Sequence, residues 1–351
     1  MNTPKLRMAV VGCGYIGHRH MAMIDANDEM ELVAVADVRA ADICDAPAGV
    51  PFFSNVDDLL ASAGQLDVVS VCTPNGFHAD IAIKILKSGA NVLMEKPLAL
   101  SVADARRIAD AEKASKGRVF SVFQNRYTPT SQWLKDVVSG GTLGDVTSVV
   151  VCCQWNRDER YYKPGSWHGT AALDGGTLFT QFSHYVDILL WIVGEVDILS
   201  ATFDDFAHKS TTDFEDTGAF IFRTRKSGAI GTFNYTTAVP AENLESSITL
   251  IGTKGSVKVA GQYMSDVAFC KIPGYIMPQL PPPNPPNDYG AYKGSAANHC
   301  YVFENIADVL LRGAEPTADL SDGMSVVDTI ERAYAFRSGN YTSSTPLTYR
   351  P

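Results

Sequence analysis

The first third of the chain alternates short apolar runs with longer segments in which apolar residues recur at helical spacing. Each run is bounded by glycine, proline or polar residues, which is typical of a strand buried on both faces of a sheet. Strands that alternate with helices indicate a doubly wound parallel sheet with right-handed crossovers. We therefore predict an α/β fold in which residues 1–123 form an N-terminal Rossmann domain. The predicted strands are residues 7–11, 31–36, 67–72, 91–94 and 118–123.

The remaining two thirds shows a different pattern. From about residue 145, strand-like runs follow one another with only turn signals between them, which indicates an antiparallel sheet. One helix is predicted between Asp174 and Val193, and a proline-rich stretch at 278–286 is typical of a stiff exposed loop or an oligomer arm. We therefore predict that residues 124–351 form an α+β domain with a large, mainly antiparallel sheet, for substrate binding and oligomerisation. The predicted strands are residues 146–155, 196–206, 217–224, 229–237, 246–251 and 256–259.

The composition narrows the possible classes of protein. A chain of 351 residues is long enough for about two domains, and 46% hydrophobic with 19% charged residues is typical of a globular protein. The formal net charge of −10 argues against nucleic-acid or anionic-membrane partners. No apolar run reaches the roughly 18 residues of a membrane span, and a first strand starting near Arg7 leaves no room for a signal peptide. We therefore expect a cytoplasmic protein.

The cysteines give a negative indication. There are seven of them, an odd number, and none has C-x-x-C spacing. This pattern supplies neither a disulfide framework nor a zinc site. We therefore expect reduced thiols and no metal centre.

A glycine motif follows the first predicted strand directly. Residues 12–17 read GCGYIG, the G-x-G-x-x-G spacing of a dinucleotide-binding turn, and a helical pattern comes next. Gly12 allows the tight turn, Gly14 lets backbone approach a pyrophosphate, and Gly17 lets helix and strand pack closely. The motif in this place predicts a dinucleotide site.

An acidic residue at the end of the second strand supports this prediction. Asp37 lies 20 residues after Gly17, at the spacing of a ribose-hydroxyl acceptor. A carboxylate there favours NAD over NADP. Arg39 leaves the choice open, because its guanidinium can pair with a 2′-phosphate or lie against the adenine ring.

Polar residues also gather at the ends of the later strands, the edge at which open parallel sheets bind ligands. The third strand is followed by TPNGFH at 73–78, and the fifth by QNRY at 124–127. The fourth ends in Glu95, Lys96 and Pro97, and the proline keeps Lys96 out of helical geometry. Lys96 is therefore a candidate acid-base residue, with a merely solvated lysine as the alternative.

The helix that ends near Val193 has a polar face without the lysines and glutamates of a solvated surface. His184 is the candidate catalytic residue on this face, and a satisfied core or surface histidine is the alternative. The face comprises Thr180, Gln181, His184, Asp187 and Trp191.

The loop at 155–169 concentrates arginines and aromatic rings in an otherwise acidic chain. Guanidinium groups and ring faces suit phosphate, carboxylate and sugar surfaces. The loop is therefore a candidate substrate site, with a flexible surface loop as the alternative. Its main candidates are Arg157, Tyr161, Tyr162 and Trp167.

Taken in order, these motifs resemble those of the Gfo/Idh/MocA oxidoreductases over nearly the whole chain. The matching segments are GCGYIG at 12–17, TPN with the histidine at 73–78, EKP at 95–97, and DGG with the later histidine and aspartate at 174–187. The resemblance implies a nicotinamide cofactor in the first domain, Lys96 as the catalytic proton carrier and His184 beside the substrate hydroxyl. It also suggests a cis Lys96–Pro97 peptide bond.

One position departs from the family. Thr180 stands where the family commonly has Asp or Asn four residues before the histidine. A carboxylate partner for Lys96 and His184 is therefore missing, and the division of proton transfer is open.

Other segments resemble the branch of the family that acts on nucleotide sugars, at residues 124–127, 157, 161–162, 167–170 and 174–176. This resemblance implies oxidation at C3 of a UDP-N-acetylglucosaminuronate-type sugar, for surface polysaccharide synthesis, by a homo-oligomer that is a dimer or tetramer. The alternatives are a free-sugar or inositol dehydrogenase, an NAD-dependent glycosidase and a non-catalytic dinucleotide-binding regulator.

The motifs and the resemblance together assign residues to two sites, with Lys96 and His184 as the catalytic residues. The cofactor residues are Gly12, Gly14, Tyr15, Ile16, Gly17, Asp37, Arg39, Thr73, Pro74, Asn75, His78, Glu95, Lys96 and Gln124. The substrate residues are Asn125, Arg126, Arg157, Tyr161, Tyr162, Trp167, Thr180, Gln181 and His184.

Overall fold

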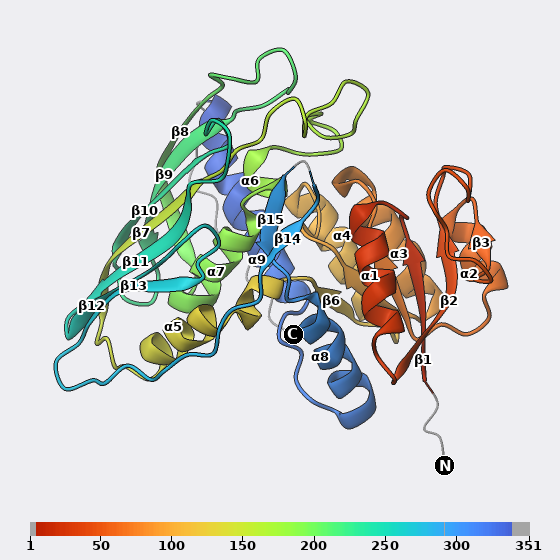
Figure 1. Cartoon of the computed structure of the whole chain (residues 1–351), viewed down its shortest axis with the longest axis horizontal. Coiled ribbons are helices and arrows are strands. Elements are labelled where there is room, and N and C mark those ends of the chain that lie inside the picture. Colours follow the sequence, from red (N-terminus) through yellow and green to blue (C-terminus); the bar gives the residue numbers. More distant parts are fainter. Residues whose placement is uncertain (1–4, 291, 339–351) are drawn as a thin grey trace. The chain divides into compact units, whose positions relative to one another are not determined.

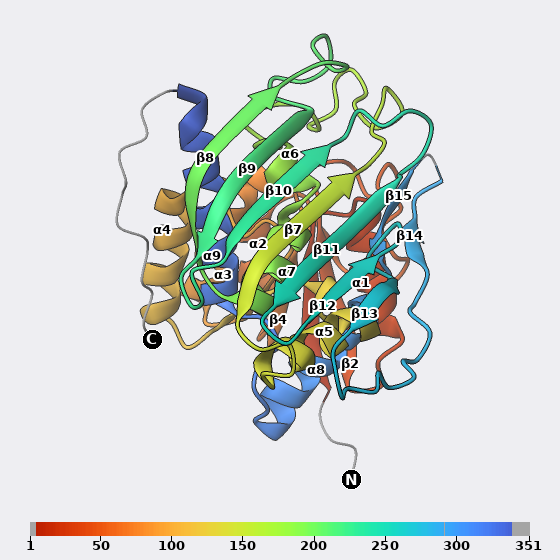
Figure 2. The same cartoon turned by 90° about the vertical axis from the view of Figure 1, so that its left-hand side faces the viewer.

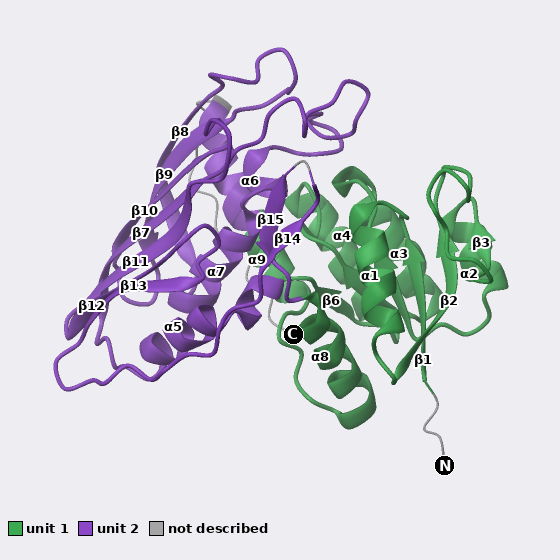
Figure 3. Ribbon diagram, in the orientation of Figure 1, with its two compact units in different colours: residues 1–123, 299–327 green, residues 124–298, 328–351 purple. Residues whose placement is uncertain are grey.

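The computed structural model describes residues 5–290 and 292–338. The chain divides into two compact units, coloured separately in Figure 3. Unit 1 contains the described residues up to 123 together with 299–327, and unit 2 contains the described residues of 124–298 and from 328 onward. Each unit is described by itself below.

Unit 1 is built on a six-stranded sheet with the order β3-β2-β1-β4-β5-β6. Every strand pair in this sheet is parallel. The strands are β1 (Leu6–Val11), β2 (Met30–Ala36), β3 (Phe52–Phe53), β4 (Val68–Val71), β5 (Asn91–Met94) and β6 (Val119–Ser121). The helices, labelled in Figure 1, are α1 (Tyr15–Asp25), α2 (Val56–Ser62), η1 (Asn75–Phe77), α3 (His78–Ser88), α4 (Val102–Lys113) and α8 (His299–Arg312). The predicted doubly wound parallel sheet is confirmed.

Local sequence explains where these elements begin and end. All four residues of β4 are buried, as expected for a parallel strand covered on both faces. Ser101 begins α4, because its Oγ accepts a hydrogen bond from the Asp104 amide at 3.0 Å. Gly89 ends α3 in the left-handed conformation, with φ of 88°.

Residues 299–327 lie in unit 1, whereas the sequence placed them in the second domain. The segment covers the open edge of the sheet, where Phe120 in β6 forms an antiparallel bridge with Asp319. The Ser121 amide donates to the Ala318 carbonyl at 3.2 Å, and the Ser121 hydroxyl donates to the Asp319 carbonyl at 2.8 Å. The edge strand β6 thereby gains backbone hydrogen-bond partners from a segment about 200 residues away, which local sequence patterns cannot predict.

Unit 2 is built on a seven-stranded sheet, seen face-on in Figure 2, with the order β13-β12-β11-β7-β10-β9-β8. Its pairs are antiparallel except for β7 with β10, which is parallel. The strands are β7 (Val146–Gln154), β8 (Val196–Asp204), β9 (Thr217–Thr224), β10 (Ile230–Thr236), β11 (Glu245–Gly252), β12 (Gly255–Ala260) and β13 (Asp266–Lys271). The prediction of a mainly antiparallel sheet is confirmed.

The remaining elements of unit 2 are short strands and helices. They are η2 (Gln124–Tyr127), α5 (Pro129–Ser139), α6 (Thr177–Thr180), α7 (Ser183–Val193), the paired strands β14 (Pro286–Asp288) and β15 (Lys293–Ala296), and η3 (Ala335–Ser338). Helix α9 (Leu320–Tyr334) crosses the boundary between the units.

The single helix predicted between Asp174 and Val193 is wrong in one respect, because it is interrupted. Phe182 separates α6 from α7 with non-helical backbone angles of −116° and 5°. Its amide donates to the Thr177 carbonyl at 3.3 Å, one residue further back than in an α-helix. The break turns the polar residues at the start of α7 relative to those of α6.

Several expectations concern the surface and the thiols. All seven cysteines are free thiols, as predicted. Within residues 5–290 and 292–338, no helix combines the length and the apolar character that a membrane crossing requires. The outer face of the large sheet exposes apolar side chains, namely Val150, Ile221, Ile230, Ile251 and Phe269. The homo-oligomer stays a prediction.

Candidate active site

The glycine turn after β1 has the geometry that its sequence requires. Gly12 has φ of +97°, and a Cβ there would lie 2.5 Å from the Cys72 carbonyl oxygen. A Cβ on Gly17 would collide with the Gly12 carbonyl oxygen, whereas one on Gly14 would meet nothing within 4 Å. Two glycines are thus needed for packing, and the third leaves open space beside the start of α1. This is the arrangement that admits a pyrophosphate to a helix N-terminus.

Two more cofactor candidates belong to this turn. Tyr15 and Ile16 form the first turn of α1, and Tyr15 is exposed. Their place after Gly14 puts both residues at the amino end of the helix.

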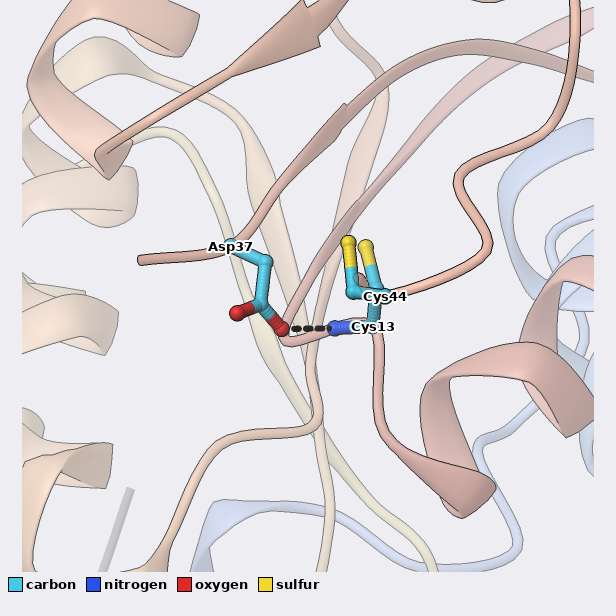
Figure 4. Close-up of side chains that lie close together, drawn as sticks. All are labelled: Cys13, Asp37 and Cys44. Carbon is cyan, nitrogen blue, oxygen red and sulfur yellow. Dashed lines mark hydrogen bonds between the residues drawn. The ribbon is translucent and has the colours of Figure 1, made fainter. Parts of the chain in front are cut away.

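Asp37 and Arg39 form an ion pair directly after β2. Asp37 Oδ2 accepts from the Cys13 amide at 2.8 Å, as drawn in Figure 4, and from Arg39 Nη2 at 2.8 Å. Arg39 Nε reaches Asp37 Oδ1 at 2.9 Å, and Arg39 Nη2 also donates to the Cys13 carbonyl at 3.0 Å. Burial would raise the pKa of Asp37, but the hydrogen bonds from Arg39 outweigh it and lower that pKa. The carboxylate is therefore ionised, and it neutralises the arginine that left the cofactor choice open.

Glu95 faces the interior of unit 1. Its Oε1 lies 2.9 Å from His20 Nε2 and 3.6 Å from His299 Nε2, and its Oε2 accepts from the Lys96 amide at 3.2 Å. Cys72 Sγ is 3.4 Å from His20 Nδ1. The predicted cofactor residue Glu95 is thus hydrogen-bonded to His20 and lies within ion-pair distance of His299, two histidines that the sequence reasoning missed, and it fixes the peptide that carries Lys96.

Lys96 itself is partly buried, and the Lys96–Pro97 peptide bond is cis, as the resemblance suggested. His78 is fully buried, with Nδ1 at 2.8 Å from the Pro97 carbonyl and Nε2 at 2.9 Å from the Thr73 carbonyl. Burial lowers the pKa of His78. His78 therefore links the ends of β4 and β5 from within. The turn that follows β4 contains Thr73, Pro74 and the buried Asn75, which opens η1.

Glu95→Gln should lower the free energy of unfolding by about 1 to 3 kcal/mol at neutral pH, because buried donors lose their charged acceptor. Burial would raise the pKa of Glu95, but the hydrogen bond with His20 and the proximity of His299 hold that pKa well below its usual range. A depressed carboxyl pKa stabilises the fold above the unfolded value of 4.5, and this stabilisation disappears as pH falls through the folded pKa. Burial also lowers the pKa of His299 below its unfolded value of 6.5. As the pH falls below about 6.5, the imidazole of His299 therefore takes up a proton in the unfolded chain before it does so in the folded protein, which favours unfolding. Wild-type stability should therefore fall with acidification.

Urea denaturation at several pH values measures this effect. Glu31→Gln is the matched control, since Glu31 is 45% exposed and pairs with Arg7 at the surface; its effect should stay within about 0.5 kcal/mol. A Glu95→Gln protein with the stability and acid sensitivity of wild type would contradict the interpretation.

In unit 2, the polar turn η2 is held by buried side chains. Gln124 Nε2 donates to Ser295 Oγ at 3.0 Å and to His184 Nε2 at 3.2 Å. Gln124 Nε2 therefore contacts the Nε2 atom of the His184 ring directly. The structure thus brings Gln124 to His184, and Asn125 is buried in the same turn.

Arg126 forms a buried ion pair with Asp187 on α7. Arg126 Nε lies 3.0 Å from Asp187 Oδ2, and Nη2 lies 2.5 Å from Oδ1. The two side chains are 3% and 1% exposed, and the Trp191 ring lies 5.5 Å from the guanidinium. The charge of Arg126, a predicted substrate residue, is therefore neutralised inside the unit, and the pair fastens η2 to α7.

Arg157 is buried in a different environment. Its Nε donates to Gln181 Oε1 at 2.7 Å, Nη1 to the Asn156 carbonyl at 2.6 Å and to Asn243 Oδ1 at 3.3 Å, and Nη2 to the Lys293 carbonyl at 3.2 Å. All of these acceptors are neutral, and in the described part of the chain no carboxylate lies within ion-pair distance of Arg157.

Aromatic rings surround this guanidinium. The rings of Trp155, Tyr161 and Tyr292 have centroids at 4.8, 5.3 and 5.0 Å from Arg157 Cζ. Burial lowers the pKa of Arg157. The site therefore holds a buried positive charge stabilised by amides, carbonyls and ring faces.

The loop at 155–169 packs into unit 2. Tyr161 and Tyr162 are buried with Phe214, and the Tyr161 hydroxyl accepts from Gln181 Nε2 at 2.7 Å. Asp174 Oδ2 accepts from the Gly169 amide at 2.8 Å and closes the loop. Trp167 stacks on His168 and stays partly exposed.

Thr180, the position that departs from the family, is used locally. Its hydroxyl donates to the Asp174 carbonyl at 2.9 Å. Gly176 precedes it with φ of +130°, and a Cβ there would lie 2.6 Å from the Tyr334 hydroxyl. Thr180 therefore helps to hold the loop that ends at Asp174.

Several contributors were not predicted from the sequence. They are His20, Cys72 and His299 around Glu95, and Asn243, Tyr292, Lys293 and Ser295 around Arg157 and Gln124. His20 and Cys72 lie next to the glycine motif and the TPNGFH segment, but neither belongs to a motif. The others come from segments with no motif, where only the polar pair Asn298-His299 at the start of α8 could have drawn attention.

We expected no metal centre, and three clusters in the described residues nevertheless have suitable donor atoms. They are Cys13, Asp37 and Cys44; His20, Glu95 and His299; and Asp205, His208 and Asp216. In the second cluster, His20 is hydrogen-bonded to Glu95 and His299 lies within ion-pair distance of the same carboxylate.

The sequence matches two family models. The one described as "Oxidoreductase family, NAD-binding Rossmann fold" covers residues 6–123, and the "GFO/IDH/MocA C-terminal domain" covers residues 131–258. A Rossmann domain that binds NAD agrees with the predicted cofactor.

Solved structures are similar over the whole chain. The WlbA dehydrogenase from Bordetella pertussis, in complex with NADH and UDP-GlcNAcA, has a TM-score of 0.86 at 31% identity and covers 99% of this chain and 100% of that chain. The WlbA dehydrogenase from Chromobacterium violaceum, also with NADH and UDP-GlcNAcA, has a TM-score of 0.87 at 30% identity, with 99% and 98% covered.

Curated relatives match over shorter stretches. The rhizopine catabolism protein MocA of Rhizobium meliloti is 28% identical over 192 residues, which are 54% of this chain and 58% of that protein. The chain spans little more than half the length of the curated relatives that it matches first.

Proposed function

This chain belongs to the Gfo/Idh/MocA family of oxidoreductases with an NAD-binding Rossmann domain, and we propose that it transfers a hydride from a secondary alcohol of a sugar to NAD. We propose as substrate a UDP-N-acetylglucosaminuronate-type nucleotide sugar, oxidised at C3. The similarity to two dehydrogenases crystallised with UDP-GlcNAcA supports this substrate class.

The observation that carries the substrate proposal is the buried guanidinium of Arg157. A buried charge is costly unless an opposite charge compensates it. A guanidinium has five N–H groups, and four of those of Arg157 bond to neutral acceptors among the described residues. One N–H of Nη2 is left for a ligand. A carboxylate or pyrophosphate would supply the missing negative charge in a charge-assisted hydrogen bond. A neutral free sugar would not.

The proposed roles of the residues follow from their environments. NAD held at the glycine turn would accept the hydride from the substrate carbon. Lys96 takes the proton of the reacting hydroxyl, and Glu95 fixes the Lys96 peptide by accepting its amide N–H. Gln124 orients the ring of His184 through its contact with Nε2, and His184 lies beside the reacting hydroxyl. Thr180 takes no part in proton transfer, because its hydroxyl is bonded to the Asp174 carbonyl.

The cofactor is proposed to be NAD rather than NADP. Asp37 is ionised and its charge already pairs with Arg39, so a 2′-phosphate would meet a carboxylate without an available guanidinium.

NADH formation on a panel of compounds tests the function. The panel contains UDP-sugars with and without a C6 carboxylate, free aldoses and inositol. We expect stoichiometric NADH and a keto sugar from the UDP-linked N-acetyl sugar acid, and far less from free sugars, since each charge-assisted contact contributes roughly ten- to a hundredfold in affinity.

Other results would select the alternatives. A preference for inositol or a free aldose would remove the nucleotide-sugar assignment and leave the dehydrogenase. Net hydrolysis without NADH would indicate the glycosidase, and neither product would indicate a regulator.

A further inference from the structure

Two thiols lie together beside the glycine turn of unit 1. Cys13 and Cys44 are 2% and 3% exposed, and their sulfurs and a carboxylate oxygen of Asp37 all lie within 4.8 Å of one another. Figure 4 shows both sulfurs on the same side of Asp37. The proposed hydride transfer uses neither thiol.

The two cysteines belong to segments of different character. Cys13 lies between Gly12 and Gly14, in a turn fixed by the close contacts of Gly12 and Gly17. Cys44 is a buried residue in the loop at 38–46, whose other residues are exposed or partly exposed. Only one layer of loop therefore separates the thiol pair from solvent.

We propose that Cys13 and Cys44 form an oxidisable dithiol, and that their disulfide lowers the affinity of the protein for NAD. The proposal rests on NAD binding at the glycine turn. It adds a modification site that the hydride-transfer reaction does not need.

The chemistry balances with hydrogen peroxide as the oxidant. The Cys44 thiolate attacks a peroxide oxygen, and hydroxide leaves as Cys44 becomes a sulfenic acid. The Cys13 sulfur then attacks the sulfenic sulfur, loses its proton and releases water. Two thiols and one peroxide thus give one disulfide and two waters.

The environment of Cys13 sets this order. Burial raises the pKa of Cys13 to about 12, and the nearby Cys44 and Asp37 add to that shift. Cys13 is therefore protonated at neutral pH and reacts second, as the resolving thiol. Formation of the disulfide should be slow, and it should become faster as pH rises.

The disulfide acts on NAD through the loop at 38–46. The sulfurs must approach to about 2.05 Å, and the tightly packed glycine turn leaves the loop as the part that moves. The same loop contains Arg39, which bonds to Asp37 and to the Cys13 carbonyl. Pulling it toward the turn narrows the space in which the adenine-side ribose would bind.

Reduced and peroxide-treated protein should be compared by peptide mapping and by NAD titration. We expect a Cys13–Cys44 linked peptide, a mass loss of two hydrogens, and an NAD dissociation constant raised by about fivefold or more. Dithiothreitol should restore the affinity, and saturating NAD should slow disulfide formation.

Cys44→Ser should bind NAD like the reduced wild type, and peroxide should no longer lower its NAD affinity. The control variant Cys270→Ser, on strand β13, should still lose NAD affinity after peroxide treatment. The proposal is overturned by an unlinked Cys13 and Cys44 after treatment, by a linked pair with unchanged affinity, or by a full response in Cys44→Ser. If that variant does not fold, the wild-type comparison decides alone. Failure of the reduced protein to bind NAD would contradict the cofactor site instead, and the peptide map would still decide whether the disulfide forms.

Discussion

Lys96→Met is expected to lower kcat by about 100-fold or more while NAD affinity stays within about threefold, because a general base typically contributes 10²- to 10⁴-fold. Methionine keeps the length and much of the volume of the side chain but removes the amine. The backbone of residue 96 stays bonded to Glu95 Oε2 in the variant, so the end of β5 keeps its position. The loss should therefore appear in the chemical step, and the rise of kcat with pH that a base produces should disappear.

Steady-state kinetics with the UDP-linked sugar acid, together with an NAD titration, measures both quantities. Lys87→Met is the matched control, since Lys87 is exposed at the end of α3 and should tolerate the change without loss of kcat. A variant at residue 96 with near-normal kcat would remove the proton-transfer assignment.

The fold was predictable wherever buried residues recur at a regular spacing along the sequence. β9 has the predicted ends, Thr217 and Thr224, because its alternating pattern is bounded by turns. The parallel pairing of β7 with β10 was not predictable. It depends on which strands meet across the sheet, and a strand carries no local mark of its neighbour's direction. The cover that residues 299–327 give to β6 is non-local in the same way.

The site was predictable where backbone sterics impose a residue type. Gly12 and Gly17 have no room for a side chain, so the motif and the geometry correspond closely. Side-chain partners were not predictable. Arg126 and Asp187 were both noticed as polar candidates, but sequence could not show that each neutralises the other. His299 joins Glu95 only through the fold, and no spacing rule connects them.

Arg157 shows the opposite outcome, because its partners sharpen the prediction made from it. A substrate anion would bind next to a guanidinium that is already oriented by Gln181, Asn243 and the Lys293 carbonyl. Such preorganisation reduces the side-chain entropy lost on binding. Arg157→Gln should therefore raise KM for the UDP-linked sugar acid by about tenfold or more, since one charge-assisted hydrogen bond is worth about 1.5 to 3 kcal/mol. Arg157→Lys should have a KM between those of the wild type and Arg157→Gln, because lysine keeps the charge and loses the planar guanidinium.

Arg160→Gln is the matched control from the same loop, because Arg160 is 48% exposed and pairs with Asp158. It should leave KM unchanged. Thermal unfolding separates lost binding from lost structure, and NAD affinity should be the same in all four proteins. If Arg157→Gln raises KM equally for UDP-sugars with and without the C6 carboxylate, the guanidinium pairs with the pyrophosphate; if only the acid is affected, it pairs with the carboxylate. An unchanged KM for both compounds in a folded variant would show that the buried charge serves the structure of unit 2 alone, and the nucleotide-sugar proposal would lose the observation that carries it.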